Sequence, residues 1–428
     1  MDGSLIDEKK IKQLNKNYNY EQVICIQLIL DQIVKFLNEE SIKSLSLCNK
    51  KIYRFYKSLI KKIKICENAE MSNIKEFFNF FDNLNNLDVS YCEKINDFNF
   101  LSKLERLESL DVSGTKISDI SFLEVNKNIK ELKLYHCKNI KDFKPIFKKE
   151  GLETLDVGYT YISDISFLEK NKKIKELKLN HCEDIKDFKP IFQLDKIEIL
   201  DISYTYISDI SFLEKNKNIK ELYLTSCENI KNFMPISKLE QLGVLDVDST
   251  NISDISFLQS NTNIQKLNLD YCKKINDFMP ISNLENLEIL NLGYTLISDI
   301  SFLEKNKNIK ELYLFICKSI VDFFPISKLE KLEILNIADT RISDISFLEK
   351  NKNIKELYLN GCKDIEYFIP ISKLGQLEVL NINRTYISDI SFLEKNINIK
   401  KLTMRYMPKI INSSSEIFKR KDIFIDYR

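Results

Sequence analysis

A repeat of 45 residues constrains what this chain can fold into more than any other feature of its sequence. Seven cysteines recur at that interval, namely Cys92, Cys137, Cys182, Cys227, Cys272, Cys317 and Cys362. The string Ile-Ser-Asp-Ile-Ser-Phe-Leu recurs at the same interval, beginning at Ile117, Ile162, Ile207, Ile252, Ile297, Ile342 and Ile387. A chain of 428 residues exceeds the usual size of a domain with one core. A fixed period instead predicts an array of short units that grows by stacking.

Each long period contains two related halves. One half carries leucine-like positions before a threonine, as in Leu152-x-x-Leu155-x-Val157-x-x-Thr160, and the other ends on a cysteine, as in Ile174-x-x-Leu177-x-Leu179-x-x-Cys182. Both halves match the leucine-rich-repeat template. The chain resembles the leucine-rich-repeat family. The threonine half is similar to the internalin type, and the cysteine half to the type common in F-box proteins.

The resemblance implies an α/β fold, a leucine-rich-repeat solenoid shaped as a curved horseshoe with a parallel sheet on its concave face. We expect fifteen repeat units over residues 84–404, eight of the cysteine type and seven of the threonine type. Each unit supplies one short strand whose alternate side chains point inward. Residues 405–428 are expected to form a C-terminal cap, because Met407 stands where the last unit should carry cysteine.

The repeated cysteines, histidines and aspartates invite a chemical interpretation, but their spacing favours a structural one. Cysteines in every second strand lie about 9–10 Å apart, beyond the reach of a disulfide or a shared metal. We therefore expect them to be buried and reduced, and we expect His136 and His181 to share no metal. The repeated acids, such as Asp164 and Asp209, precede Ile-Ser-Phe-Leu and are expected to cap short helical turns. The sequence thus predicts no cofactor and no metal site.

Composition narrows the classes of function. Lys plus Arg (64) and Asp plus Glu (63) give a formal net charge of +1, which disfavours nucleic acid and acidic membranes as partners. No signal peptide or membrane span is apparent, so a soluble, monomeric, cytoplasmic protein is expected. No phosphate loop, nucleophile elbow or histidine-based triad appears. The sequence predicts no catalytic residues, and the protein is expected not to be an enzyme.

The outward strand positions are where a solenoid is expected to bind a partner. Between the strand leucines, acidic and basic residues alternate in the first repeats, whereas later repeats carry neutral residues and tyrosine. Two interpretations remain open: a protein-binding site, or surface drift with the rings packing on neighbouring strands. For the first interpretation the candidate partner-binding residues on the concave face are Tyr223, Tyr271, Tyr294, Tyr313, Phe315, Ile316 and Tyr358.

The segment before the repeats lacks the period and has helical spacing of apolar residues. We divide it into an extension (1–20), a helical module (21–66) and a helical N-terminal cap (67–83). The module resembles the F-box, which implies docking on the adaptor of cullin-RING ubiquitin ligases. The resemblance carries adaptor binding over to Ile33, Phe36, Leu37, Ile42, Leu45 and Leu47. The Ile, Asn and Lys bias without Trp resembles proteins of amoebae and their large DNA viruses.

These observations lead to two hypotheses for function. In the first, the protein is the substrate-recognition subunit of a ubiquitin ligase, with the substrate on the repeats. In the second, it is an interaction scaffold without a ligase role, and its N-terminal helices only cover the open end of the solenoid.

Overall fold

The structure is a computed structural model that describes residues 61–65, 83–406 and 416–427. The F-box-like residues Ile33 to Leu47 lie outside these ranges. The chain divides into two compact units, Met1–Ile162 and Ser163–Arg428.

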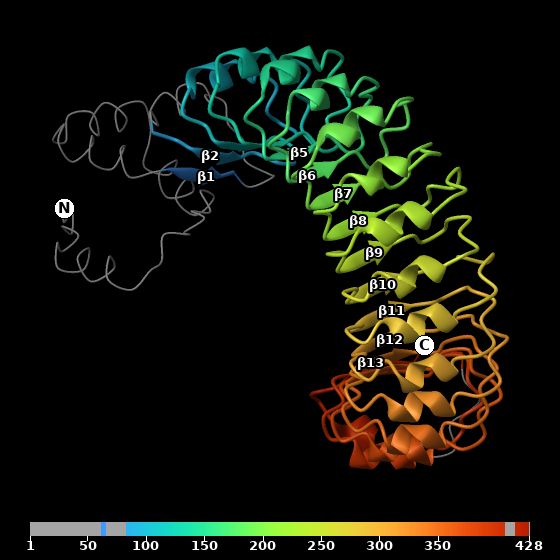
Figure 1. Ribbon diagram of the computed structural model, residues 1–428. Coiled ribbons are helices and arrows are strands. Elements are labelled where there is room, and N and C mark those ends of the chain that lie inside the picture. Colours follow the sequence, from blue (N-terminus) through green and yellow to red (C-terminus); the bar gives the residue numbers. More distant parts are fainter. Residues whose placement is uncertain (1–60, 66–82, 407–415, 428) are drawn as a thin grey trace, which may run out of the picture. The chain divides into compact units, whose positions relative to one another are not determined.

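The first unit contains a parallel sheet in which every strand pairs with the next one in the sequence (Figure 1). Its strands are β1 (Lys62–Lys64), β2 (Asn86–Asp88), β3 (Ser109–Asp111), β4 (Glu131–Lys133) and β5 (Thr154–Asp156). Between the strands lie the 3-10 helices η1 (Asn99–Lys103), η2 (Ser121–Glu124) and η3 (Lys144–Lys148).

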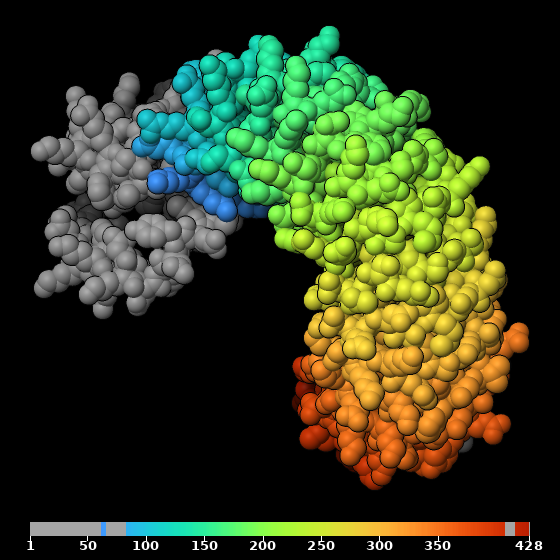
Figure 2. Space-filling view, in the orientation of Figure 1, coloured from blue at the N-terminus to red at the C-terminus, as the bar shows by residue number. Residues whose placement is uncertain are grey.

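The second unit repeats the same arrangement, with all neighbouring strands parallel. Its strands are β6 (Glu176–Lys178), β7 (Ile199–Asp201), β8 (Glu221–Tyr223), β9 (Val244–Asp246), β10 (Lys266–Asn268), β11 (Ile289–Asn291), β12 (Glu311–Tyr313), β13 (Ile334–Asn336), β14 (Glu356–Tyr358), β15 (Val379–Asn381), β16 (Lys401–Thr403) and β17 (Phe424–Asp426). Its 3-10 helices are η4 (Ser166–Glu169), η5 (Lys189–Gln193), η6 (Ser211–Glu214), η7 (Met234–Lys238), η8 (Ser256–Gln259), η9 (Met279–Asn283), η10 (Ser301–Glu304), η11 (Phe324–Lys328), η12 (Ser346–Glu349), η13 (Ile369–Lys373), η14 (Ser391–Lys395) and η15 (Glu416–Lys419). Figure 2 shows the repeats of this unit packed on one another in chain order, from green to red.

The core of the second unit is built from files of identical side chains. In strands β6 to β16 the central leucine points inward and is buried, as Leu200, Leu222 and Leu245 illustrate. The phenylalanines that follow the repeated Ile-Ser motif form a second file, in which Phe212 and Phe257 are each 1% exposed. One repeat could not bury these side chains alone, so stacking on its neighbours supplies most of the hydrophobic stabilisation.

The fold confirms the predicted leucine-rich-repeat solenoid and adds detail that the sequence pattern lacked. The fifteen expected strands are β2 to β16, and the structure adds β1 and β17 at the two ends. Strand β1 falls within residues 21–66, for which a helical module was expected, and pairs in parallel with β2. In the described residues every helix is a 3-10 helix of four or five residues, because each unit has only a few residues left after its strand and turns. None of these helices is long and apolar enough to cross a membrane.

The threonine and cysteine files share backbone acceptors just after the strands. The Thr205 hydroxyl donates to the carbonyl oxygen of Ile202 at 2.7 Å, and the Cys227 thiol of the next repeat donates to the same oxygen at 3.2 Å. The same sharing recurs at Val112, Val247, Leu292 and Ile337. A threonine-type repeat lies between each cysteine-type repeat and the next, so no two of the periodic cysteines lie on adjacent strands. All seven periodic cysteines are buried and form no disulfide, as expected from their spacing.

Burial raises the pKa of these thiols, which lowers their expected reactivity in the native protein. Loss of solvation is the largest cause that raises the pKa of Cys137, Cys227, Cys272 and Cys317 to about 11. At pH 8 only about one thiol in a thousand would then be ionised, and the thiolate is the reactive form. We expect the seven periodic cysteines to react slowly with iodoacetamide under native conditions and rapidly in urea, measured for each site by peptide mass spectrometry. Fast native labelling of Cys227 or Cys272 would contradict the burial of the file.

The repeated aspartates hold the turns that precede the 3-10 helices. Asp164 accepts the backbone N–H of Ser166 at 2.8 Å, and Asp209 accepts that of Ser211 at the same distance. The other five copies make the same bond, also at 2.8 Å. Each aspartate stands one residue before the N-cap, so it fixes the turn that leads into the helix. The expected capping role therefore appears as an Asx turn.

Replacing Asp164 or Asp209 with alanine is expected to lower the free energy of unfolding by about 0.5–2 kcal/mol. The hydrogen bond from the Ser211 backbone is the largest cause that lowers the pKa of Asp209. Its contribution is therefore present above the ordinary Asp pKa of about 3.9 and is lost as the pH falls through the lowered value. Urea denaturation at pH 7 measures the loss of stability. The same measurement in strong acid is expected to show a smaller difference between the variant and the unchanged protein. Glu214→Ala, an exposed change on the same helix as Ser211, serves as the control.

A column of buried asparagines was not predicted from the sequence. It comprises Asn126, Asn171, Asn216, Asn261, Asn306, Asn351 and Asn396, each 0–1% exposed. The Asn261 amide donates to the carbonyl oxygens of Ile236 and Leu239 in the preceding unit, at 3.0 and 2.9 Å. Each of these carbonyls also accepts a backbone N–H of its own repeat, from Leu239 and Leu242 respectively, so the asparagine adds a second hydrogen bond to each oxygen. The asparagine column therefore joins adjacent repeats by hydrogen bonds inside an apolar core.

Candidate protein-binding face

The outward side chains of strands β7 to β14 form the surface that we call the strand face. In each unit it comprises the first and third strand residues and the second residue after the strand, for example Val244, Asp246 and Asp248 on β9. The inward residues between them are buried in the core. Because packing fixes the inward positions, variation along this face is free to serve recognition.

The predicted tyrosines at the third strand position lie on this face but are half-buried. The hydroxyls of Tyr223, Tyr313 and Tyr358 donate to the carboxylates of the glutamates two residues earlier, at 2.7–2.8 Å. Burial is the largest cause that raises the pKa of all three phenols, to about 12 for Tyr358, and the adjacent glutamate adds to it. These rings therefore lie against their strands and leave one edge accessible.

Other predicted residues occupy a turn with an unusual backbone. Tyr271, Tyr294 and Ile316 have φ values of 57, 53 and 62°, in the left-handed region. The corresponding residue of the other repeats has the same conformation, and it is a glycine only at Gly114 and Gly361. A side chain in this region costs roughly 1–2 kcal/mol, and a β-branched residue such as isoleucine is rare in it. The array therefore keeps bulky, partly exposed side chains where glycine would fit with less strain.

Aromatic contacts link this turn column from repeat to repeat. In the first unit His136 lies 6.0 Å from Tyr159 between ring centroids, and in the second His181 stacks on Tyr204 at 4.0 Å. Among the described residues, no group of three or more His, Cys, Asp or Glu side chains could hold a metal ion. The histidines are therefore placed as ring partners of tyrosine.

Three predicted residues form one aromatic cluster, which we define as Tyr271, Tyr294 and Phe315. The ring centroids of Tyr271 and Tyr294 are 4.8 Å apart, and those of Tyr294 and Phe315 are 5.5 Å apart in an edge-on arrangement. The Phe315 ring lies over Gly293, where a Cβ atom would come within 2.4 Å of it. Tyr271 is 44% exposed. The structure thus brings these three together, while Tyr223 and Tyr358 lie on strands β8 and β14 to either side.

Carboxylates dominate the charge of the strand face, which sequence analysis missed. Between β7 and β14 the face carries seven acids, Asp201, Glu221, Asp246, Asp248, Asp270, Glu311 and Glu356, against one base, Lys266. Adding the second residue after each strand to the column between the leucines would have revealed this excess. The chain as a whole has a formal net charge of only +1. The excess of negative charge is therefore local.

The acids on β9 and β10 repel one another. Asp246 accepts hydrogen bonds from Thr225 and Asn268, and Asp248 accepts one from Ser249, so these donors are neutral. Burial and then the charge of Asp248 raise the pKa of Asp270 to about 6. Burial and then Asp246 raise the pKa of Asp248. No cation is among the causes that shift the pKa of Asp248 or Asp270. This part of the face therefore holds several carboxylates without a neutralising charge.

The rim of the sheet, just before the strands, has the opposite character. There, lysine and glutamate of adjacent repeats form ion pairs, as Lys220 does with Glu198 at 2.7 Å. The same pair recurs at Lys310–Glu288, Lys355–Glu333 and Lys400–Glu378. Such exposed pairs contribute little stability, but they keep the rim neutral. The rim therefore adds no negative charge to that of the strand face.

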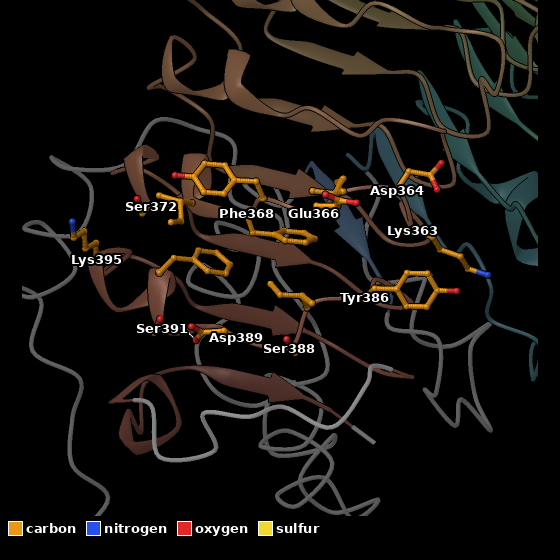
Figure 3. Close-up of a pocket in the computed structure, with 15 residues that line it drawn as sticks. Lys363, Asp364, Glu366, Phe368, Ser372, Tyr386, Ser388, Asp389, Ser391 and Lys395 are labelled. Atoms are coloured by element: carbon orange, nitrogen blue, oxygen red, sulfur yellow. Dashed lines mark hydrogen bonds between the residues drawn. The ribbon is translucent and has the colours of Figure 1, made fainter.

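A hollow of about 880 Å³ lies away from this face, beside η13 and η14 (Figure 3). Tyr367 lines it and stands where every earlier cysteine-type unit has an Asp or Asn that accepts a backbone N–H, as Asp322 does from Phe324. Tyr367 is 60% exposed. A smaller hollow, of about 270 Å³, occupies the equivalent place around residues 96–122. The hollow is therefore a feature of the repeat that is enlarged in the last units.

These features define the fold: stacked repeats of one parallel strand and one 3-10 helix, joined by leucine and asparagine files, are the architecture of a leucine-rich-repeat solenoid. The family model described as Leucine Rich repeats (2 copies) matches residues 330–374. Comparison with curated proteins gives no match.

Solved structures show the same fold at low sequence identity. An internalin (inlF) of Listeria monocytogenes is 23% identical with a TM-score of 0.50, covering 82% of this chain and 88% of that chain. The functional domain of InlJ from the same organism, which includes a cysteine ladder, is 17% identical with a TM-score of 0.56, covering 72% and 69%. A complex of TLR13 with ssRNA13 is 15% identical with a TM-score of 0.51, covering 87% of this chain and 57% of that chain.

Proposed function

We propose that this protein is a non-catalytic binding protein that holds a protein partner on the strand face of its second unit. The observation that carries the proposal is the aromatic cluster of Tyr271, Tyr294 and Phe315. It combines partly exposed rings with a left-handed turn position that the fold requires, occupied at Tyr271 and Tyr294 by bulky side chains where glycine would be less strained. Rigid aromatic side chains on a polar background are typical of the residues that dominate protein interfaces.

The charge of the face favours a protein over a nucleic acid. One structural neighbour is a complex with single-stranded RNA, but its likeness to this chain shows the fold alone. Binding a polyanion requires lysine and arginine at the contact, whereas the strand face carries seven acids and one lysine. A phosphate backbone placed on the strands would lie directly over Glu221, Glu311 and Glu356, whose charges would repel it.

We further propose, from the sequence resemblance alone, that the F-box-like segment docks on a ubiquitin-ligase adaptor, which would make the bound partner a substrate. The residues concerned lie outside the described ranges. Co-purification of the full chain with the purified adaptor tests this role, with Phe36→Ala/Leu37→Ala as the loss variant. If neither form of the chain binds the adaptor, the interaction scaffold without a ligase role is the better hypothesis.

Proximity labelling with the full chain in its native cell, followed by binding assays on the captured proteins, tests the binding function. A captured protein counts as a partner only if its binding depends on the strand face. The double variant Tyr313→Ala/Phe315→Ala supplies this criterion, and its expected effect is given in the Discussion. Binding that is indifferent to the strand-face variant would place the site elsewhere.

A further inference from the structure

Phe315 of the aromatic cluster lies in one continuous row of the strand face with the carboxylates of Asp248 and Asp270, and Tyr271 and Tyr294 stand one residue further along the chain, in the adjoining turns. The second residue after each strand forms this row, which runs Asp248, Asp270, Gly293 and Phe315 over β9, β10, β11 and β12. Backbone hydrogen bonds show that the repeats carrying these residues are adjacent. The Ser249 N–H donates to the backbone carbonyl oxygen of Asp270, and the Tyr271 N–H donates to that of Gly293, both at 2.9 Å.

Gly293 gives this row its shape. Because glycine has no side chain, the Phe315 ring fills the space above it. No other side chain of the row therefore stands between the ring and Asp270. The result is an apolar surface that directly adjoins two carboxylates.

The protein itself shows how a cation can use such a surface. The ammonium group of Lys273 lies 3.8 Å from the centroid of the Tyr271 ring, in the geometry of a cation–π contact. Lysine and arginine combine an apolar stem with a charged end, so they can cover an aromatic ring and still reach a carboxylate.

We propose that the surface formed by Tyr271, Tyr294, Phe315, Asp248 and Asp270 binds a segment of the protein partner that carries lysine or arginine. The stems lie on the aromatic cluster, and the charged ends pair with the two carboxylates. This inference rests on the proposed function and names the chemistry of the partner. The partner's positive charge relieves the mutual repulsion of acids that the fold holds together, which gives charge complementarity at a site already apolar.

The inference is tested with the full chain and two fluorescent peptides of the same length, one with lysine at alternate positions and one with acetyl-lysine in their place. Acetylation removes the charge and keeps the stem. Fluorescence anisotropy at physiological ionic strength is expected to show binding of the lysine peptide and weaker binding, by about tenfold or more, of the acetylated one.

Three variants separate the parts of the site. Asp248→Asn/Asp270→Asn is expected to weaken lysine-peptide binding about tenfold and to fold normally, because it removes repulsion. Gly293→Ala leaves every charge in place but displaces the Phe315 ring, and is expected to weaken binding several-fold. Glu304→Gln/Glu349→Gln removes two exposed charges on η10 and η12 and is the matched control, expected to bind as the unchanged protein does.

Equal binding of the two peptides, full binding by the Asp248→Asn/Asp270→Asn variant, or an equal loss in the control variant would overturn the inference. None of these results bears on whether the native partner needs Tyr313 and Phe315. If that dependence is found while the peptides fail, the proposed function stands and only the cationic partner is wrong. If the native partner binds equally well without the Tyr313 and Phe315 side chains, the proposed function itself fails.

Discussion

Replacing Asn261 with alanine is expected to lower the free energy of unfolding by about 2–4 kcal/mol. The substitution removes one of the two donors from each of two buried carbonyl oxygens, those of Ile236 and Leu239, and leaves a cavity where a side chain was 0% exposed. Each lost hydrogen bond contributes about 0.5–1.5 kcal/mol, and the cavity adds the lost packing. Urea denaturation followed by circular dichroism measures the change.

Asn263 provides a closely matched control two residues further along. Its side-chain amide also donates to a carbonyl of the preceding unit, that of Glu240 at 2.8 Å, but this bond is exposed to solvent. Water can replace the lost donor, so Asn263→Ala is expected to cost less than about 1 kcal/mol. Similar losses for the two variants would mean that burial is not what makes the asparagine column important.

Replacing both Tyr313 and Phe315 with alanine is expected to weaken partner binding by about 2 kcal/mol or more, or roughly 30-fold. The two residues lie on and just after β12, and Phe315 is the ring that covers Gly293 and contacts Tyr294. The change removes the Phe315 ring from the aromatic cluster and breaks the bond between the Tyr313 hydroxyl and Glu311. Isothermal titration calorimetry with the captured partner gives the loss, and thermal melting verifies that the variant is folded.

Lysines on other strands serve as the comparison for binding. Lys178 on β6 is already paired with Glu176 at 2.7 Å, and Lys133 lies on β4 of the first unit. Alanine at either position is expected to change binding by less than about 0.5 kcal/mol. The reverse ranking, with the lysines critical and the aromatic residues silent, would place the contact among the charged early repeats.

The sequence alone determined the architecture, because the period that specifies it is written in local side-chain patterns. Alternation of apolar residues fixed the short strands and their inward faces, and the spacing of Cys227 and Cys272 showed that neither could bridge to the other. The Asp209 turn was likewise foreseeable, since it depends on contacts two residues apart. Each of these features is decided within one repeat or by the distance between repeats, so the chain need not be folded to infer it.

The tertiary structure decided which repeated residues are buried and which distant ones become neighbours. Asn261 reads as a polar surface residue in the sequence, yet stacking places it over carbonyls that belong to the previous unit. Strand β1 gains its identity only from pairing with β2, because three residues carry no period of their own. The row of Asp248, Asp270 and Phe315 likewise exists only where successive strands lie side by side. Residues more than 20 positions apart meet there, and their shared charge and shape follow from stacking, which no pattern within a single unit records.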